Sequence, residues 1–342
     1  MSKPHRGDFA KIPDPNFSGS ETLHTGKPRQ NGKQRMTPAR DRLDTLWWLP
    51  QGSAMSLPGR TVTGSARPPE AEPHPLRRLL ALGRPVVMGV LNVTPDSFSD
   101  GGRFIDPAAA IAQARRIVVE GADILDVGAE STRPYGSAVP VSLTDELARL
   151  EPVLPAAIET GVPVSIDTIK AKVAGWALRA GAAIVNDVWG LQRDPDMARV
   201  VAEHRVPVIV MHNRDAADPT IDIVADVTAF FARSLDIAAR AGIDRDRIVL
   251  DPGVGFGKTP EQSMAVIARL DAFRSFGLPL LVGASRKRFI DTVVPSAHDR
   301  RLGGSIAAHL VAVRNGAAIV RVHDVTETVQ ALRVAAAIGA AP

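Results

Sequence analysis

The chain has 342 residues, of which 45% are hydrophobic and 23% are charged, and it contains no cysteine. This composition is typical of a protein with a large apolar core, and it excludes a wholly disordered chain, disulfide bonds, thiolate metal sites and a cysteine nucleophile. Residues 1–80 carry 13 Lys and Arg against 7 Asp and Glu, whereas residues 81–342 carry 28 against 30, so the net charge of +4 comes from the first part. Because the second part has no basic excess and no long apolar run, we expect no nucleic-acid partner, no membrane span and a cytoplasmic location.

Residues 1–80 are rich in Pro, Gly and Ser. Their apolar residues show no periodicity long enough to build a helix or a pair of strands, so we predict a disordered basic extension. The short apolar segment 46–49 (LWWL) is expected to dock on the folded part or on a neighbour. Alternatively, it belongs to residues without a function that an upstream start codon adds. The folded domain is predicted to occupy residues 81–342.

From residue 84, short apolar runs alternate with segments of helical spacing. Eight runs read as strands that are buried on both faces, as in a parallel sheet: 86–93, 124–128, 162–167, 184–188, 206–212, 248–251, 278–285 and 319–324. Helical spacing lies between them, for example in 107–120, 145–160, 170–180, 224–241 and 305–315. Gly121, Gly181, Gly242 and Gly316 follow four of these helices, as left-handed caps do. Eight such units in about 260 residues predict an α/β fold, the (β/α)8 TIM barrel, and a doubly wound sheet is disfavoured because no dinucleotide fingerprint follows the first strand.

Polar residues gather where the predicted strands end, which is the end of a TIM barrel that carries the active site. Asp167 and Asp251 directly end buried strands, and Asn186 ends the strand after Asp167. Buried carboxylates without partners are costly, so they predict a ligand rich in N–H donors, or a basic partner such as Lys287 for Asp251. For Asp187 and Asp324, a role in the site and a role only as the N-cap of the following helix are equally consistent with the sequence.

A cationic group is expected at the seam of the barrel. Arg133, Arg321 and His323 follow or end the two strands that flank the first strand, which ends in Asn92. Because Arg binds phosphate in a bidentate manner, this convergence predicts a phosphate site. The segment 253–259 (GVGFGKT) is not a P-loop, since Pro252 stands where the first glycine of that motif is required.

Seven segments together resemble the signature motifs of the dihydropteroate synthase family, in the order and spacing of that family. They are 92–102 (NVTPDSFSDGG), 130–134 (ESTRP), 165–168 (SIDT), 186–188 (NDV), 251–258 (DPGVGFGK), 285–287 (SRK) and 321–325 (RVHDV). The resemblance covers the chain from about residue 85 to its end. Two features depart from the family pattern: the long leader, and the loop after ESTRP, where Tyr135 intervenes before Gly136 and residues 137–140 lengthen the loop.

The resemblance implies a role for each matching position. Residues implied in pterin binding are Asp167, Asn186, Val188, Met211, Asp251, Lys287 and Arg321. Those implied for 4-aminobenzoate are Thr132, Arg133, Pro134, Phe256 and Ser285, and those for pyrophosphate are Asn92, Arg133, Arg321 and His323. Asn92 is also implied as the contact of Mg²⁺, and Asp96, Arg133, Lys287 and Arg321 as catalytic residues.

The implied reaction joins 6-hydroxymethyl-7,8-dihydropterin pyrophosphate to 4-aminobenzoate and releases 7,8-dihydropteroate and pyrophosphate, a step of folate biosynthesis. The resemblance implies dissociative substitution, closure of the loops after the first two strands with Gly101-Gly102 as hinge, competition by sulfonamides, and a homodimer through the last helices. Two alternatives stay open. A pterin-binding barrel of the methyltransferase type would not need the STRP and RVHDV segments, and a non-catalytic paralogue should have lost Asn92, Arg133, Lys287 or Arg321.

Overall fold

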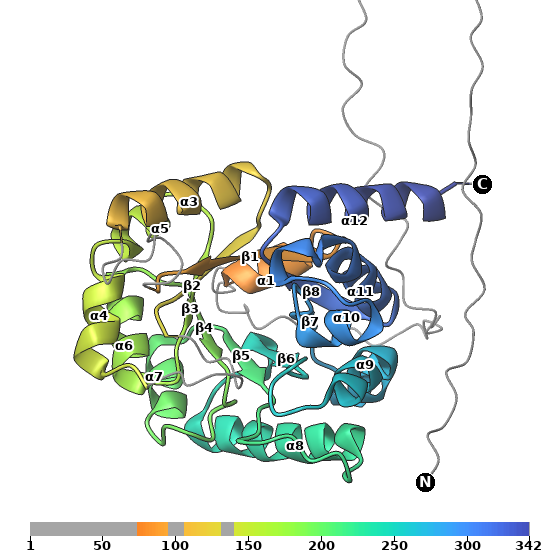
Figure 1. Cartoon of the computed structure of the whole chain (residues 1–342). Helices are drawn as coiled ribbons and strands as arrows, with labels where there is room; N and C mark the ends of the chain where they lie inside the picture. Colours follow the sequence, from red (N-terminus) through yellow and green to blue (C-terminus); the bar gives the residue numbers. More distant parts are fainter. Residues whose placement is uncertain (1–73, 95–105, 131–139, 342) are drawn as a thin grey trace, which may run out of the picture. The chain divides into compact units, whose positions relative to one another are not determined.

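The computed structural model describes residues 74–94, 106–130 and 140–341. Eight parallel strands form a closed barrel in which each strand pairs with the next along the chain and β1 pairs with β8 (Figure 1). The strands are β1 (Val86–Asn92), β2 (Ile124–Gly128), β3 (Val164–Asp167), β4 (Ile184–Asp187), β5 (Val208–Met211), β6 (Ile248–Asp251), β7 (Leu280–Val282) and β8 (Ala317–Val322). The predicted TIM barrel is confirmed.

Helices surround the barrel in Figure 1. They are α1 (Pro75–Leu80), α3 (Pro107–Val119), α4 (Leu143–Leu150), α5 (Leu154–Ile158), α6 (Ala171–Ala180), α7 (Met197–His204), α8 (Ile223–Ala241), α9 (Pro260–Ala268), α10 (Arg288–Val293), α11 (Leu302–Arg314) and α12 (Val325–Gly339). The predicted helix 145–160 is divided into α4 and α5, because Pro152 and Pro155 lack the N–H groups that a continuous helix needs. The glycines after the four predicted helix ends all have positive φ, which confirms left-handed ends there. In the described part of the chain, no helix has the length and apolar character of a membrane span.

Side chains alternate between the lumen and the outer face along each strand. The lumen positions near the N-terminal ends of the strands form one apolar layer: Val86, Met88, Ile124, Ile184, Ile209, Val249, Leu281 and Ile319. Two residues further along five of these strands, the lumen positions are Asp126, Asn186, Met211, Asp251 and Arg321. The lumen therefore changes from apolar to largely polar within one step of the strand repeat.

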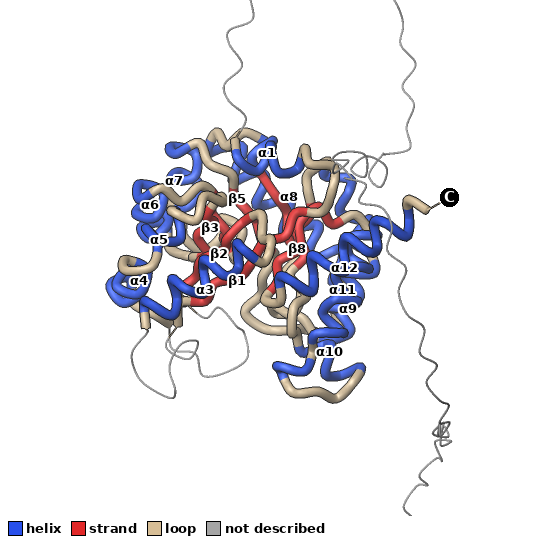
Figure 2. Tube along the Cα trace, turned by 90° about the horizontal axis from the view of Figure 1, so that it is seen from above, coloured by secondary structure: helices blue, strands red, loops and turns tan. Residues whose placement is uncertain are grey.

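The N-terminal end of the barrel is covered by α1, which begins after its N-cap His74. Leu76 of α1 is 1% exposed and packs with the apolar layer of the lumen, together with Leu79 and Leu80. Figure 2 places α1 at one end of the strands and α10, which follows β7, at the other. The prediction of disorder up to residue 80 is therefore wrong for residues 75–80, because a helix of 6 residues is too short to show a periodicity in sequence. Residues 1–73 of the predicted extension, including the LWWL segment, lie outside the described residues.

Candidate active site

Three acidic side chains and one arginine meet in the polar layer of the lumen. Arg321 Nε donates to Asp126 Oδ2 at 2.6 Å, and Arg321 Nη2 donates to Asp167 Oδ2 at 2.8 Å. Asn186 Nδ2 also donates to Asp126 Oδ2, at 3.2 Å. Asp251 is close enough for its charge and that of Arg321 to influence each other's pKa. The structure thus brings together the middle-strand acids and Arg321 at one end of the barrel.

The expected position of Arg321 needs a correction. The strand pattern places Arg321 in a cationic group with Arg133 and His323, and the family resemblance adds a pterin contact. In the structure its guanidinium lies directly between two carboxylates. The reason is the strand repeat, since Arg321 follows Ile319 by two residues and therefore faces the lumen at the level of Asp126. The Arg321 guanidinium therefore contacts the two carboxylates directly, while the residue itself lies on β8 next to β1.

Burial leaves acceptor atoms of this group without partners. Asp126 Oδ1 and Asp167 Oδ1 are buried and accept no hydrogen bond from the described residues. Burial raises the pKa of Asp167 to about 7, against the opposing effect of the Arg321 charge. Burial also raises the pKa of Asp251 to about 6, although the Gly253 N–H donates to its Oδ1 at 2.7 Å. Buried acceptors of this kind are costly unless a ligand supplies N–H donors.

An apolar wall adjoins the acids. Val188, Met211 and Phe256 form a buried cluster, against which Ile169 and Trp189 pack. Lys287 Nζ lies 4.0 Å from the centroid of the Phe256 ring, and its charge also lowers the pKa of Asp251 against the effect of burial. Residues implied for the pterin and for 4-aminobenzoate therefore lie side by side.

Ser285 and His323 are also neighbours. Ser285 Oγ lies 2.9 Å from His323 Nδ1 and accepts from the His323 backbone N–H at 3.3 Å. Asn92 ends β1 between β2 and β8, as predicted. The predicted residues Asp96, Gly101, Gly102, Thr132, Arg133, Pro134 and Tyr135 lie outside the described residues.

The two aspartates with open interpretations have structural contacts. Asp187 accepts the backbone N–H groups of Trp189 at 2.9 Å and Leu191 at 2.6 Å, so it caps the turn after β4. Asp324 makes no capping bond to α12 with its side chain and instead pairs with Arg286 through both carboxylate oxygens. The Asp324 pair holds the loop that carries Ser285 and Lys287.

Asp126 and Lys258 were not singled out from the sequence as site residues. Asp126 stands in the middle of a buried strand, where an unexplained acid in an apolar run was the available signal. Lys258 is fully buried, and its Nζ lies 2.6 Å from His212 Nδ1. The position of Lys258 at the end of a glycine-rich segment predicts neither its burial nor its contact with His212.

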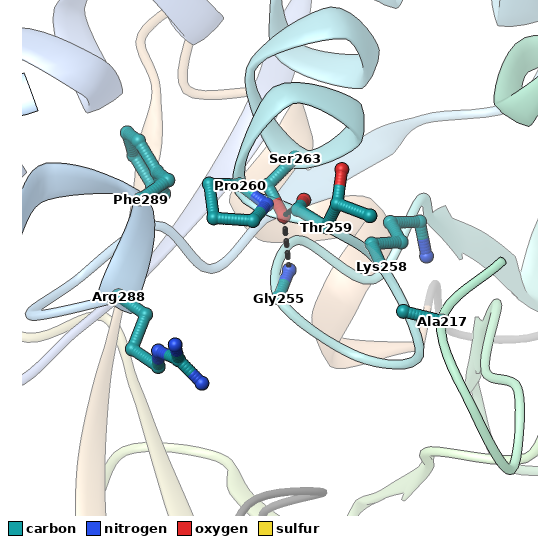
Figure 3. A pocket seen from close by; sticks show the side chains of 8 residues that line it. All are labelled: Ala217, Gly255, Lys258, Thr259, Pro260, Ser263, Arg288 and Phe289. Carbon is teal, nitrogen blue, oxygen red and sulfur yellow. Dashed lines mark hydrogen bonds between the residues drawn. The ribbon is translucent and has the colours of Figure 1, made fainter. Parts of the chain in front are cut away.

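A cavity of about 220 Å³ lies beside the loop between β6 and α9 (Figure 3). Its lining residues are Ala217, Gly255, Lys258, Thr259, Pro260, Ser263, Arg288 and Phe289. Ser263 Oγ accepts the Gly255 N–H at 3.2 Å, which anchors the loop to α9 at the wall of this cavity.

Comparison with known proteins gives one consistent family. The family model described as "Pterin binding enzyme" matches residues 88–323. The dihydropteroate synthase of Bacillus subtilis (strain 168) is 45% identical over 243 residues, which are 71% of this chain and 84% of that protein. That of Escherichia coli (strain K12) is 42% identical over 262 residues, 75% of this chain and 92% of that protein.

Solved structures agree with these relatives. Dihydropteroate synthase from Xanthomonas albilineans with 4-aminobenzoic acid has a TM-score of 0.72 and 44% identity, covering 76% of this chain and 94% of that one. The same enzyme in complex with 7,8-dihydropteroate has a TM-score of 0.68 and 43% identity, covering 76% and 95%. The chain therefore belongs to the dihydropteroate synthase family, the pterin-binding transferases of folate biosynthesis.

Proposed function

We propose that this chain joins 6-hydroxymethyl-7,8-dihydropterin pyrophosphate to 4-aminobenzoate, forming 7,8-dihydropteroate and pyrophosphate. The observation that carries the proposal is the polar layer of the lumen, where Asp126 and Asp167 each keep a buried oxygen atom that has no donor among the described residues, beside Arg321. Relatives support the substrates, since the Xanthomonas albilineans enzyme has been solved with 4-aminobenzoic acid and with 7,8-dihydropteroate.

The acids would bind the pterin through its N–H groups. Asp251, fixed by the Gly253 N–H, would accept from the 2-amino and N3–H edge, and Asp167 and Asn186 would complete the contacts. Such charge-assisted bonds contribute about 1.5–3 kcal/mol each. Val188 and Met211 would pack against the ring.

Substitution at the pterin methylene would follow a dissociative course. The C–O bond breaks and its electron pair leaves with the pyrophosphate, while the electron-rich ring stabilises the resulting cation. The aryl amine then attacks the methylene and loses one N–H proton to the solvent. The departing pyrophosphate would be held by Arg321, His323 and Arg133, while Lys287 would reach the pterin ring. Asp96, in the segment after β1, would be a further catalytic residue. Phe256 and Ser285, with Thr132 and Pro134, would hold 4-aminobenzoate.

Asn92 would supply one oxygen ligand to Mg²⁺. No group of three His, Asp or Glu side chains suited to a metal ion occurs among the described residues. Mg²⁺ commonly uses one or two protein oxygens together with substrate phosphates and water, so the Asn92 amide oxygen and the pyrophosphate form a suitable donor set. When bound, the ion would neutralise part of the charge of the leaving group.

We also propose a homodimer through α11 and α12, which pack on each other. Val334 and Ile338 of α12 are 53% and 71% exposed, which is costly for large apolar side chains that face only water. A monomer in gel filtration at micromolar concentration would refute this arrangement. The proposal further includes a cytoplasmic location. It also includes competition by sulfonamides at the 4-aminobenzoate site, to be measured as an inhibition constant because the sequence departs from the family pattern at Tyr135.

The decisive experiment is a synthase assay with purified chain, Mg²⁺ and both substrates. We expect equal amounts of dihydropteroate and pyrophosphate, with the described barrel from residue 74 as active as the full chain. A chain that binds the pterin but releases no pyrophosphate would favour the methyltransferase type of barrel or a non-catalytic paralogue. Methyl transfer from a methylated pterin to a corrinoid would then separate those two alternatives.

A further inference from the structure

The loop between β6 and α9 is packed tightly against the segment that follows β5. Its glycines Gly253, Gly255 and Gly257 have φ values of +66°, +79° and +53°. A Cβ atom at Gly253 would lie 1.9 Å from the carbonyl oxygen of His212, and one at Gly257 would lie 2.4 Å from the Cβ of Arg214. The loop backbone therefore lies directly on the His212–Arg214 segment, and only glycine fits at these two contacts.

Lys258 ties this loop together from inside. Its side chain is fully buried, and Nζ lies 2.9 Å from the carbonyl oxygen of Gly253 and 3.1 Å from that of Phe256. Nζ also lies 2.6 Å from His212 Nδ1. A lysine ammonium has three N–H donors, so these three acceptors match its charged form. Burial lowers the pKa of Lys258 to about 7, and the nearby charges of Asp251 and Asp226 oppose this shift. In Figure 3 the Lys258 side chain points away from Pro260 and Phe289.

A second set of contacts fixes His212. Because Nδ1 accepts from Lys258, Nε2 carries the hydrogen and donates to Asp226 Oδ2 at 3.0 Å. Arg214 Nη1 donates to the same oxygen at 2.9 Å. Burial and the nearby Lys258 charge lower the pKa of His212 to about 3, so the imidazole stays neutral and can accept from Lys258. The chain of contacts runs from the partly exposed Asp226 to the buried ammonium.

The atoms that Lys258 holds are adjacent to the proposed substrate contacts. The Gly253 N–H fixes Asp251 Oδ1 at 2.7 Å, and the carbonyl of the same residue accepts from Lys258. Phe256, whose carbonyl is the other backbone acceptor, presents its ring to Lys287. A shift of the loop would therefore move the acceptor proposed for the pterin and the ring proposed for 4-aminobenzoate together.

We propose that Lys258 is a positioning residue of the active site, which holds Asp251 toward the pterin and Phe256 toward 4-aminobenzoate, and whose own place is set by His212 and Asp226. This inference rests on the proposed function for the identity of the two substrates. It assigns Lys258 no contact with either substrate.

The test compares Lys258→Met with the unchanged full-length chain. Methionine has a similar length and no N–H donors, so it fills the space without holding the carbonyl groups. We expect the KM values for both substrates to rise at least ten-fold, while kcat falls less than three-fold. The inhibition constant of pyrophosphate should stay within two-fold, because its proposed contacts come from β1, β8 and the loop after β2. Calorimetric binding of the pterin pyrophosphate should weaken in parallel with its KM.

Leu154→Ala is the matched control for a loss of stability. Leu154 is fully buried in α5, in the outer layer of the core, and takes no part in the proposed site. It should lower the melting temperature and leave both KM values unchanged when assayed well below the transition. A folded Lys258→Met variant with unchanged KM values, or with a changed pyrophosphate constant of the same size, would overturn the inference.

If Lys258→Met does not fold, Asp226→Asn tests the same chain of contacts from its partly exposed end. Removing the charge that orients His212 should raise both KM values two- to five-fold, and unchanged values would overturn the inference. Failure of the proposed function is a separate result. Absence of turnover in the unchanged chain would end that proposal, whereas the calorimetric comparison would still decide whether Lys258 positions the pterin site.

Discussion

Replacing Arg321 with methionine should leave two buried carboxylates without their shared cation. Asp126 is fully buried and Asp167 is 11% exposed at the side chain, and both accept from Arg321. Removing one partner of a buried ion pair costs about 3–5 kcal/mol, because the remaining charge stays desolvated. For a domain of this size that loss lowers the melting temperature by about 6–20 °C.

The loss should depend on pH, with a sign that follows from Asp167. Burial raises its pKa to about 7 in the folded protein, from 3.8, so the folded state binds more protons than the unfolded state between these values. Stability therefore falls as the pH rises through this window, by about 1.4 kcal/mol per pH unit at most. Arg321 is the main influence that opposes this shift, so its loss raises the pKa further and extends the window above pH 7.

We therefore expect the deficit of Arg321→Met to be larger at pH 8.5 than at pH 6. Urea unfolding followed by tryptophan fluorescence at both pH values measures it, with the melting temperature as a second readout. Arg240→Met is the control, because Arg240 pairs with Asp236 on the surface, at 66% and 61% exposure, where such a pair contributes about 0–1 kcal/mol. Equal losses in the two variants, or a deficit that is larger at pH 6, would refute the reasoning.

Three further changes test other parts of the site. Asp251→Asn replaces an acceptor by a partial donor and should weaken pterin binding by about 10- to 150-fold in calorimetry, which corresponds to one charge-assisted bond; unchanged affinity would contradict its role. Ser305→Ala removes the hydroxyl that accepts the Arg286 N–H at 2.9 Å, and should lower the free energy of unfolding by about 1–3 kcal/mol, measured in urea. A loss below about 0.5 kcal/mol, which is the range of ordinary surface substitutions, would show that other contacts hold the loop. Gly257→Ala should destabilise the chain more than Gly242→Ala, because both have positive φ but only Gly257 is crowded by neighbouring backbone, so equal melting temperatures would contradict the packing.

The sequence predicts the barrel well because its strands are apolar on both faces and four of its helices are followed by glycine. Strand ends also indicate Asp167, Asn186 and Asp251, since each is the last or nearly the last residue of an apolar run. Asp126 is different, because it lies in the middle of β2, and its level in the lumen is set by the register that pairs it with Val90 and Ser165. Register between strands far apart in sequence is a property of the closed barrel, and no local pattern encodes it.

The partners of Arg321 and Lys258 could not be predicted from the sequence either. The sequence predicts Arg321 beside phosphate, and the family resemblance adds a pterin contact, but neither predicts its pairing with two acids, which depends on the height of β8 relative to β2 and β3. Lys258 stands in a segment that resembles a P-loop without being one, and its burial follows from three left-handed glycines that fold the chain over it. Chemical type was readable from the sequence, whereas the partner of each charged group was not.

The short helix α1 decides where a shortened chain can begin. Leu76 fills the end of the lumen, and His74 caps its helix by accepting the Arg77 N–H at 3.3 Å. A protein that starts at Ala81, just after this helix, would open the floor of the barrel to water and expose the aliphatic side chains above it. Truncations intended for crystallisation or screening should therefore keep His74, and lower solubility of the version that starts at Ala81 would be the first sign of the missing cover.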